Sequence, residues 1–436
     1  MKWIRYYGTA LVVACVFGRS VSADLSREEI EQAIAAGVRR LISQQEDDGH
    51  WPHAPVVRNG IINDRYKIGC TALAVLALQH SRIKSIEVHN AIKKGLSFIL
   101  QQPPEPNTYT AGCVLQALYW DNPTRHRKMI AAYAWMLCNG QKLTGSQKGS
   151  WTYSLARLPS DWAQRGLRRR GTPPSGRSDN SNSQFAILGL IYAQKAGFQI
   201  PRVVWERARD YYIGAQHQDG GWDYQSDAYR REQNITRPRP SSHNMTFAGT
   251  VSIYMCEEML ADKSHKQCKP PPLNESYEDG LKWIADHWST GLSGYGWYAC
   301  ERLGILTGNS EFGGHDWLEE GTRDILRRKG NYTGRGGVRP NTAFAVLFLS
   351  RALEPIMINK LAWNGDWNND PYDIKHLCEH ITWDYQNPRQ WRIVTLESPV
   401  EHLLRVPILY FNGHQALKFT DAEKHKLKEY VERGGT

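Results

Sequence analysis

The chain has 436 residues, of which 41% are hydrophobic and 22% are charged, and its formal net charge is +10. These values are normal for a globular protein, and the length is too great for one ordinary core, so we expect two domains. The eight cysteines include no C-x-x-C pair, which excludes a zinc ribbon. The 16 Trp and 37 Gly residues are many for this length and predict a repeated packing device in which indoles lie beside glycines.

The N-terminal segment has the features of an export signal. Lys2 and Arg5 give a positive start, a short apolar run follows, and a small-residue cleavage site ends at Ala23. We therefore expect a signal peptide at residues 1–23, a periplasmic or secreted protein, and no transmembrane helix in the mature chain. The residues before Cys15 also resemble a bacterial lipoprotein box, so a lipid anchor at Cys15 is the alternative.

Two kinds of helical segment alternate along the next part of the chain. Apolar runs rich in small residues predict buried helices at residues 69–78, 111–118, 183–190, 246–254, 297–306 and 341–349. An amphipathic segment precedes each of them, at residues 27–44, 87–100, 125–138, 202–215, 277–288 and 317–328. An open stack of such helix pairs would need polar caps, and none is evident, so a closed ring is favoured. We predict a mainly α fold, an (α/α)6 toroid of about six helix pairs over residues 24–353.

A short sequence motif recurs at the ends of several outer helices. Residues 216–222 (Gln-His-Gln-Asp-Gly-Gly-Trp) are the clearest copy and residues 44–51 a close second, while residues 147–151 and 294–297 look like weaker copies. The glycine ends the helix at a positive φ, and the tryptophan folds back over the helix end. The motif resembles the QW repeat of squalene and terpenoid cyclases, which are related in fold to protein prenyltransferase β subunits. This resemblance implies the toroid fold but not a particular reaction.

The pattern changes after Leu353. Residues 354–390 read as a polar linker, and residues 391–436 read as strand, helix, strand and helix, which is the beginning of a parallel α/β sheet. This segment resembles the uncharacterised Rossmann-like domain that follows squalene-cyclase-type repeats in some bacterial exported proteins, notably planctomycete ones. Two strands cannot make a stable sheet covered on both faces, so we expect this domain to be incomplete at Thr436.

Three long loops lead from outer to inner helices, at residues 46–67, 139–180 and 223–244. In a ring they lie together above the N-termini of the inner helices, which attract anions. Two of these loops are rich in arginine, so we predict an anionic ligand such as an acidic glycan, a lipid headgroup or a phosphate; a solvated loop is the alternative. The candidate ligand-binding residues are Arg168, Arg169, Arg170, Arg231, His243 and Asn244.

Three polar residues of the predicted inner helices are candidates for catalysis. Glu301 lies within a buried run and would be a general acid with a raised pKa, while Tyr298 or Asn182 would position the substrate. A structural ion pair, with Arg302 or with another helix, is the alternative for Glu301. For Asn182 the alternative is a role in capping its own helix.

The catalytic motifs of the families that this chain resembles are absent. There is no Asp-x-Asp-Asp acid motif, no Asp-Asp-x-x-Asp magnesium motif, no prenyltransferase zinc-ligand pattern and no thioester motif. Nucleotide-binding, serine-hydrolase and metalloprotease motifs are also absent. We therefore expect an exported toroid that binds a ligand or partner, with no metal, no cofactor and no nucleic acid. The alternative is an enzyme, cyclase-like or acting on an acidic or hydrophobic polymer, that uses a central cavity.

Overall fold

The computed structural model describes residues 25–52, 56–58, 61–63, 66–165, 167, 176–237, 239–261, 274–328, 338–385, 388–406 and 408–436. The signal peptide predicted at residues 1–23, with the possible anchor site Cys15, lies outside these residues. So do the candidate ligand-binding residues Arg168, Arg169 and Arg170. Within the described residues, the helices are all too short or too polar to span a bilayer.

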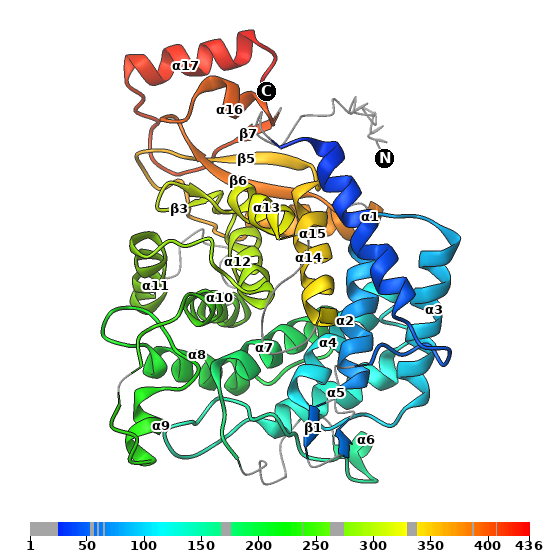
Figure 1. Cartoon of the computed structure of the whole chain (residues 1–436). Coiled ribbons are helices and arrows are strands. Elements are labelled where there is room, and N and C mark those ends of the chain that lie inside the picture. Colours follow the sequence, from blue (N-terminus) through cyan, green and yellow to red (C-terminus); the bar gives the residue numbers. More distant parts are fainter. Residues whose placement is uncertain are drawn as a thin grey trace, which may run out of the picture.

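Outer and inner helices alternate along the chain and form a closed ring (Figure 1). The outer helices are α1 (Arg27–Ser43), α3 (Ile86–Gln101), α5 (Arg127–Gly140), α8 (Arg202–Ala215), α11 (Glu275–Asp286) and α13 (Trp317–Arg327). The inner helices are α2 (Lys67–His80), α4 (Thr108–Asp121), α7 (Asn180–Lys195), α10 (His243–Leu260), α12 (Gly294–Thr307) and α14 (Val338–Ala352). Each inner helix packs on the next, and α14 packs back on α2. The predicted (α/α)6 toroid is confirmed.

The residues of each helix suit its layer. In α1, Ser26 and Glu29 form a capping box, and Ile30, Ile34 and Val38 are buried on one face. By contrast, α2 and α7 are buried on nearly every side. Helices that are apolar all round are stable only inside a shell of other helices, which is the arrangement that the ring provides.

Three turns with a shared set of hydrogen bonds tie the ring together. We call them Gln–Gly–Trp turns and name each by its tryptophan, Trp51, Trp151 or Trp222. The indole N–H donates to a carbonyl in the last turns of the preceding outer helix at 2.7–2.9 Å. The tryptophan backbone N–H donates to a Thr or Ser hydroxyl of the next inner helix. The glutamine amide donates to the carbonyl of the turn glycine and to a carbonyl of the next outer helix. Each turn therefore joins two outer helices and one inner helix.

Space and backbone conformation require the glycine of these turns. Gly149 has a φ of +96°, and a Cβ atom there would lie 1.9 Å from the carbonyl oxygen of Arg207. The glutamine of the same turn is Gln141, not the Gln147 of the predicted copy, because this turn is longer than the other two. The copy predicted at residues 294–297 was wrong, since these residues begin α12 behind the cap residue Ser293.

The long loops gather at one end of the ring, which we call the loop face (Figure 1). They carry the hairpin of β1 (Val56–Arg58) and β2 (Ile61–Asn63), together with α6 (Trp162–Arg165) and α9 (Asp227–Glu232). A short hairpin of β3 (Glu311–Phe312) and β4 (His315–Asp316) joins α12 to α13. The strands that follow the ring lie at the opposite end (Figure 1).

These strands form a parallel sheet in the order β6-β5-β7. Its elements are β5 (Ile356–Ala362), α15 (Asp373–Tyr385), β6 (Gln390–Thr395), α16 (Val400–Leu404), β7 (Ile408–Tyr410) and α17 (Asp421–Glu432). The interpretation of residues 354–390 as a linker was wrong, because this range contains the central strand β5 and helix α15. Asn359 and Lys360 are fully buried in β5, and two such polar residues disguise a buried strand in the sequence.

Helix α15 joins the sheet to the ring through buried charges. Lys375 contacts Glu258 of α10 and lies 2.8 Å from Glu379, which in turn lies 2.9 Å from Lys195 of α7. Burial by itself would raise the pKa of Glu258, but the cation of Lys375, a hydrogen bond from His376 and the cation of Lys195 hold that pKa well below its usual range. Breaking a buried pair is costly, so these contacts fasten the sheet to this end of the ring.

Candidate functional site

Side chains from facing helices meet inside the ring. Tyr298 of α12 donates to Gln116 Oε1 of α4 at 3.0 Å. Phe185 of α7 stacks on Tyr295 and Tyr298 with ring centroids 6.0 and 6.1 Å apart. Phe344 of α14 lies 5.1 Å from Tyr298. The interior is occupied by aromatic side chains at this level, which does not favour a substrate there.

Glu301 lies one turn farther along α12, in a buried cluster of alternating charge. Its Oε1 accepts hydrogen bonds from Arg302 and, at 3.1 Å, from Nε of Arg351. Arg351 Nη1 also donates to both carboxylate oxygens of Glu354 at 2.6 and 2.7 Å. Two carboxylates and two guanidinium groups balance one another, as buried charges must. The contacts therefore favour a structural ion pair for Glu301 over a general acid.

The N-termini of several inner helices are already capped on the loop face. Asn182 Nδ2 donates to Asp179 Oδ1 at 2.8 Å, and the same oxygen accepts the Asn182 backbone N–H at 2.9 Å. Asn107 and Ser293 cap α4 and α12 through the same kind of bond. Asn182 is thus engaged with its own helix cap, and its described hydrogen bonds do not include Glu301 or Tyr298. These capped ends offer an anion fewer free N–H groups than the sequence predicts.

His243 and Asn244, at the start of α10, take part in packing. His243 Nε2 lies 2.5 Å from the carbonyl oxygen of His287, and its ring meets Trp283 at 5.2 Å. Asn244 Nδ2 donates to Ser293 Oγ at 3.1 Å and so links α10 to the cap of α12. Neither contact points to a ligand. Arg231, in contrast, is exposed on α9 and lines a pocket.

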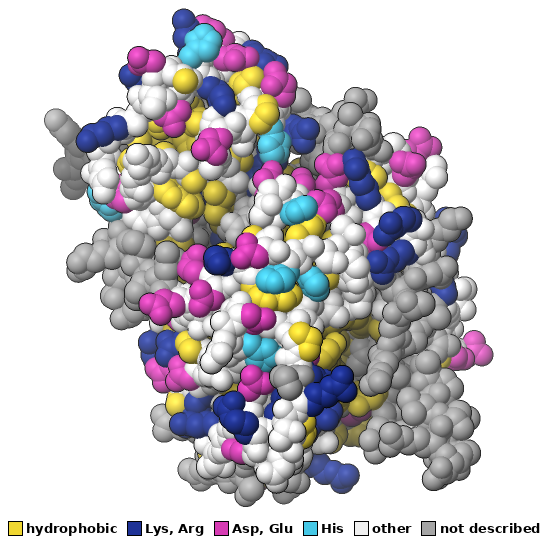
Figure 2. Space-filling model, turned by 60° about the vertical axis from the view of Figure 1, so that its left-hand side comes forward, with side chains coloured by type: hydrophobic (Ala, Val, Ile, Leu, Met, Phe, Trp, Pro, Cys, Tyr) yellow, Lys and Arg dark blue, Asp and Glu magenta, His cyan; other side chains and the backbone are white. Residues whose placement is uncertain are grey.

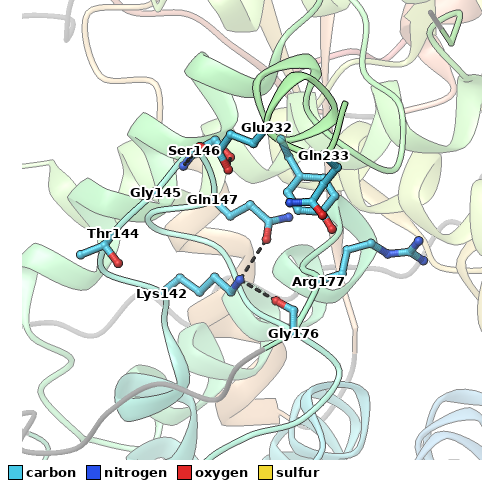
Figure 3. Close-up of a pocket in the computed structure, with 10 residues that line it drawn as sticks. Lys142, Thr144, Gly145, Ser146, Gln147, Gly176, Arg177, Glu232 and Gln233 are labelled. Atoms are coloured by element: carbon cyan, nitrogen blue, oxygen red, sulfur yellow. Dashed lines mark hydrogen bonds between the residues drawn. The ribbon is translucent and has the colours of Figure 1, made fainter. Parts of the chain in front are cut away.

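Two pockets lie on either side of α9, and we call the first, of about 370 Å³, the Lys142 pocket. Lys142 Nζ donates to Gln147 Oε1 at 2.9 Å and to the Gly176 carbonyl oxygen at 2.5 Å (Figure 3). Burial lowers the pKa of Lys142, and the nearby carboxylate of Glu232 opposes that shift. Arg177 stands at the rim with its guanidinium group pointing outward (Figure 3). The pocket thus has one inner cation and one outer cation.

The second pocket, of about 490 Å³, lies between the Trp222 turn, α9 and the residues before α10, and we call it the His217 pocket. Its charged and polar lining residues include His217, Asp219, Asp227, Arg231, Arg239 and Ser241. His217 and Asp219 belong to the Trp222 turn, which is bonded to α8, α10 and α11. The ring scaffold therefore holds these two side chains in fixed positions.

Asp219 is hydrogen-bonded through both of its carboxylate oxygens. Oδ1 accepts from Ser241 Oγ at 2.7 Å and from the Gly221 backbone N–H at 3.0 Å, and Oδ2 accepts from Trp283 Nε1 at 3.1 Å. Burial would raise the pKa of Asp219, but these hydrogen bonds outweigh it and lower that pKa. Asp219 is therefore an ionised acceptor at neutral pH.

The side of the molecule that carries α11 presents histidine rings packed on tryptophans. Figure 2 shows histidines along the middle of this face and Lys and Arg side chains toward its lower end. His287 stacks on Trp283 with centroids 4.4 Å apart, and His315 stacks on Trp288 at 5.2 Å. In the part of the chain that the structure describes, no three His, Cys, Asp or Glu side chains are grouped to hold a metal ion.

Comparisons with known proteins concern the two parts of the chain separately. The family model described as "Domain of unknown function (DUF4159)" matches residues 357–436, which cover the parallel sheet and its helices. No curated protein matches the chain. Among solved structures, it is similar to the type II terpene cyclase MstE from Scytonema, with 14% identity, a TM-score of 0.45, and coverage of 76% of this chain and 99% of that one.

The chain is also similar to Candida albicans protein geranylgeranyltransferase-I complexed with GGPP. The identity is 12%, the TM-score is 0.41, and the match covers 74% of this chain and 90% of that one. At such identities a likeness concerns the fold and not the activity. The toroid itself is established by the packing of its inner helices.

The sequence predicted a ligand at the loop face but did not single out Lys142, His217 and Ser241, which line the two pockets. Lys142 follows a Gln–Gly–Trp glutamine and carried no motif of its own. His217 had one usable signal, because it occupies the position that Glu46 holds in the Trp51 turn. Ser241 is far from both in sequence, and only the folded loop brings it to His217.

Proposed function

We propose that this chain is an exported toroid protein that binds an anionic ligand on its loop face, beginning with the Lys142 pocket. The proposal rests on the hydrogen bonds of the Lys142 ammonium group. It has three N–H donors, of which Gln147 and Gly176 accept two. Among the described residues no other acceptor contacts Lys142 Nζ, so we assign the third N–H to a ligand oxygen. Hydrogen bonds from a cation to an anion are among the stronger ones in proteins.

The acidic side chain that lines this pocket, Glu232, is already hydrogen-bonded to Ser146. Glu232 accepts the Ser146 backbone N–H at 3.1 Å and the Ser146 hydroxyl at 2.7 Å. These bonds hold the Glu232 carboxylate to one wall, so it competes less with a ligand for Lys142. Arg177 at the rim adds a second positive charge that attracts anions from solution.

Export is the second part of the proposal. It rests on the positively charged start, the apolar run and the small-residue site that ends at Ala23. An exported protein meets extracellular or envelope polymers, many of which are polyanions, and this setting agrees with a basic loop face. Processing is tested by N-terminal sequencing of the protein recovered from its native host: a start at Asp24 supports simple cleavage, and a modified start at Cys15 supports a lipid anchor.

Retention on an acidic-glycan or heparin column at low salt tests the binding. We expect the protein to be retained and to elute as salt rises, because exposed charges are screened. The double variant Lys142→Gln with Arg177→Gln should elute at clearly lower salt. Lys282→Gln is the matched control, since Lys282 is an exposed lysine of α11 that forms a surface pair with Asp286. Equal elution of the double variant and the control would contradict the proposal.

A further inference from the structure

The hydrogen bonds of the His217 pocket fix which nitrogen of His217 faces the pocket as an acceptor. Asp219 is an ionised acceptor, so the Ser241 hydroxyl proton lies in the 2.7 Å bond to Asp219 Oδ1. The Ser241 oxygen is then free to accept, and His217 Nδ1, at 3.1 Å, must donate to it. When the imidazole is neutral, its proton is therefore on Nδ1 and Nε2 carries a lone pair.

His217 Nε2 makes no hydrogen bond to any residue that the structure describes, although only 9% of its side chain is exposed. Oδ1 of the Asp227 carboxylate lies 3.8 Å from Nε2, beyond hydrogen-bond distance. An acceptor buried without a donor costs about 1–3 kcal/mol. A ligand that brings a hydroxyl to Nε2 removes this cost and binds more tightly for that reason.

The other charged groups of the pocket divide into acceptors and donors. Asp227 is half exposed at the start of α9, and its carboxylate is a second acceptor beside His217 Nε2. Arg231 and Arg239 are the donors, and Arg239 lies 3.6 Å from Asp223 at the edge of the same loop. A bare anion such as sulfate would satisfy the arginines but would meet two acceptors. A neutral polyol would satisfy the acceptors but would bring no counter-charge to Arg231, which forms no ion pair among the described residues, whereas Arg239 already lies near Asp223.

We propose that the His217 pocket binds an acidic saccharide, with sugar hydroxyls donating to His217 Nε2 and Asp227 and the carboxylate bound by Arg231 and Arg239. The volume of about 490 Å³ lies in the range of small-molecule sites and suits one or two sugar rings. This assignment rests on the anion-binding function proposed above and names the ligand class. The Lys142 pocket, on the other side of α9, then receives a further acidic group of the same saccharide.

Titration calorimetry of the full chain with digalacturonate tests this assignment. We expect the diuronate to bind at least tenfold more tightly than inorganic sulfate and than the neutral disaccharide made by reducing both carboxylates. The variant His217→Asn keeps an amide that can donate to Ser241 but removes Nε2, and it should weaken diuronate binding about tenfold, the value of one hydrogen bond. Asp227→Ala tests the second acceptor at an exposed position, where folding is not at risk, and should weaken binding severalfold.

The control is Glu46→Gln, which changes the equivalent position of the Trp51 turn and should leave the affinity unchanged. Sulfate binding as tightly as the diuronate, or unchanged affinity in both His217→Asn and Asp227→Ala, overturns the saccharide assignment. If heparin is still retained through Lys142 in that case, the proposed anion-binding function stands while this inference fails. If neither heparin nor the diuronate binds, both fail.

Discussion

The Trp51 and Trp222 turns have the same framework but different surroundings. In both, an aspartate (Asp48 or Asp219) accepts the N–H two residues later, at 3.1 and 3.0 Å, and a tryptophan indole is bonded to the outer helix behind it. The residue three before the glycine differs, however. It is Glu46 in the first turn and His217 in the second, where the loop that carries α9 closes a pocket over it.

This comparison separates positions that build the ring from the position at which we propose that a ligand binds. Glutamine and tryptophan recur because they bond the turn to neighbouring helices, and glycine recurs because it packs closely against the next outer helix. The aspartate accepts a backbone N–H within the turn. Three positions differ between the two turns, namely Glu46/His217, Asp47/Gln218 and His50/Gly221. Of these, His217 has a nearly buried side chain that lines a pocket. In a repeat protein, a residue that departs from the repeat at a rigid position is a stronger sign of function than one that conforms to it.

The largest expected effect comes from removing either tryptophan. Trp51→Ala and Trp222→Ala each delete a fully buried indole and its hydrogen bond, and each should lower the free energy of unfolding by about 3–5 kcal/mol. Urea denaturation followed by circular dichroism measures this. The comparison predicts similar losses for the two variants. A loss below about 1 kcal/mol for either one would show that its turn does not hold the ring together.

The glutamines should give a smaller effect of the same kind. Gln45→Leu and Gln216→Leu each remove two hydrogen bonds to backbone carbonyls, so we expect a loss of about 1–3 kcal/mol in the free energy of unfolding. In the Trp151 turn Gln141 holds the corresponding place, so Gln141→Leu should cost about as much as Gln45→Leu. A loss of less than about 0.5 kcal/mol for Gln141→Leu would show that the assignment of that turn needs revision.

The smallest effect concerns the two turn aspartates and pH. For Asp48, burial raises the pKa, but hydrogen bonds from His50 and the charges of His50 and Lys67 lower it overall, and Asp219 is also lowered. A carboxyl group with a lowered pKa in the folded state adds stability above its unfolded pKa, about 3.9, and this is lost as pH falls through the folded value. Both side chains are largely exposed, so each contribution is under about 1 kcal/mol.

Unfolding measured between pH 5 and pH 2 tests this sign. Asp48→Asn and Asp219→Asn should each lower the neutral part of the stability curve slightly and leave its value near pH 2 nearly unchanged, so that the acid limb becomes flatter. A difference in stability between parent and variant that grew as the pH fell from 5 to 2 would contradict the sign of the shift.

The sequence predicted the ring well because its signal is repeated and periodic. Apolar runs such as residues 183–190 stay apolar on every face, and α1 keeps one clear buried face. Strand β5 was missed because Lys360 is buried inside it. The Lys360 ammonium group donates to Asp373 Oδ1 at 2.7 Å and to the Asp370 carbonyl oxygen at 2.7 Å. These partners allow the charge to be buried, whereas the hydrophobic pattern of the sequence predicts that a lysine is exposed to solvent.

The candidate site was predicted only in outline. Loop lengths and charge predicted the loop face and Arg231 as candidates. The pockets could not be predicted, because they depend on how α9 packs against the Trp222 turn, which is a tertiary contact. Glu301 drew attention as a buried acid. Its partner Arg351 lies 50 residues away, on α14, so no local pattern could show the ion pair.

The central claim is that the ligand sits on the loop face beside α9 and not inside the ring. A crystal structure of the protein with digalacturonate bound tests it most directly. We predict sugar density against His217 and Arg231, with a carboxylate near the arginines and a hydroxyl within hydrogen-bond distance of Nε2. Sugar density within the ring, in contact with Tyr298 and Phe185, would contradict the account.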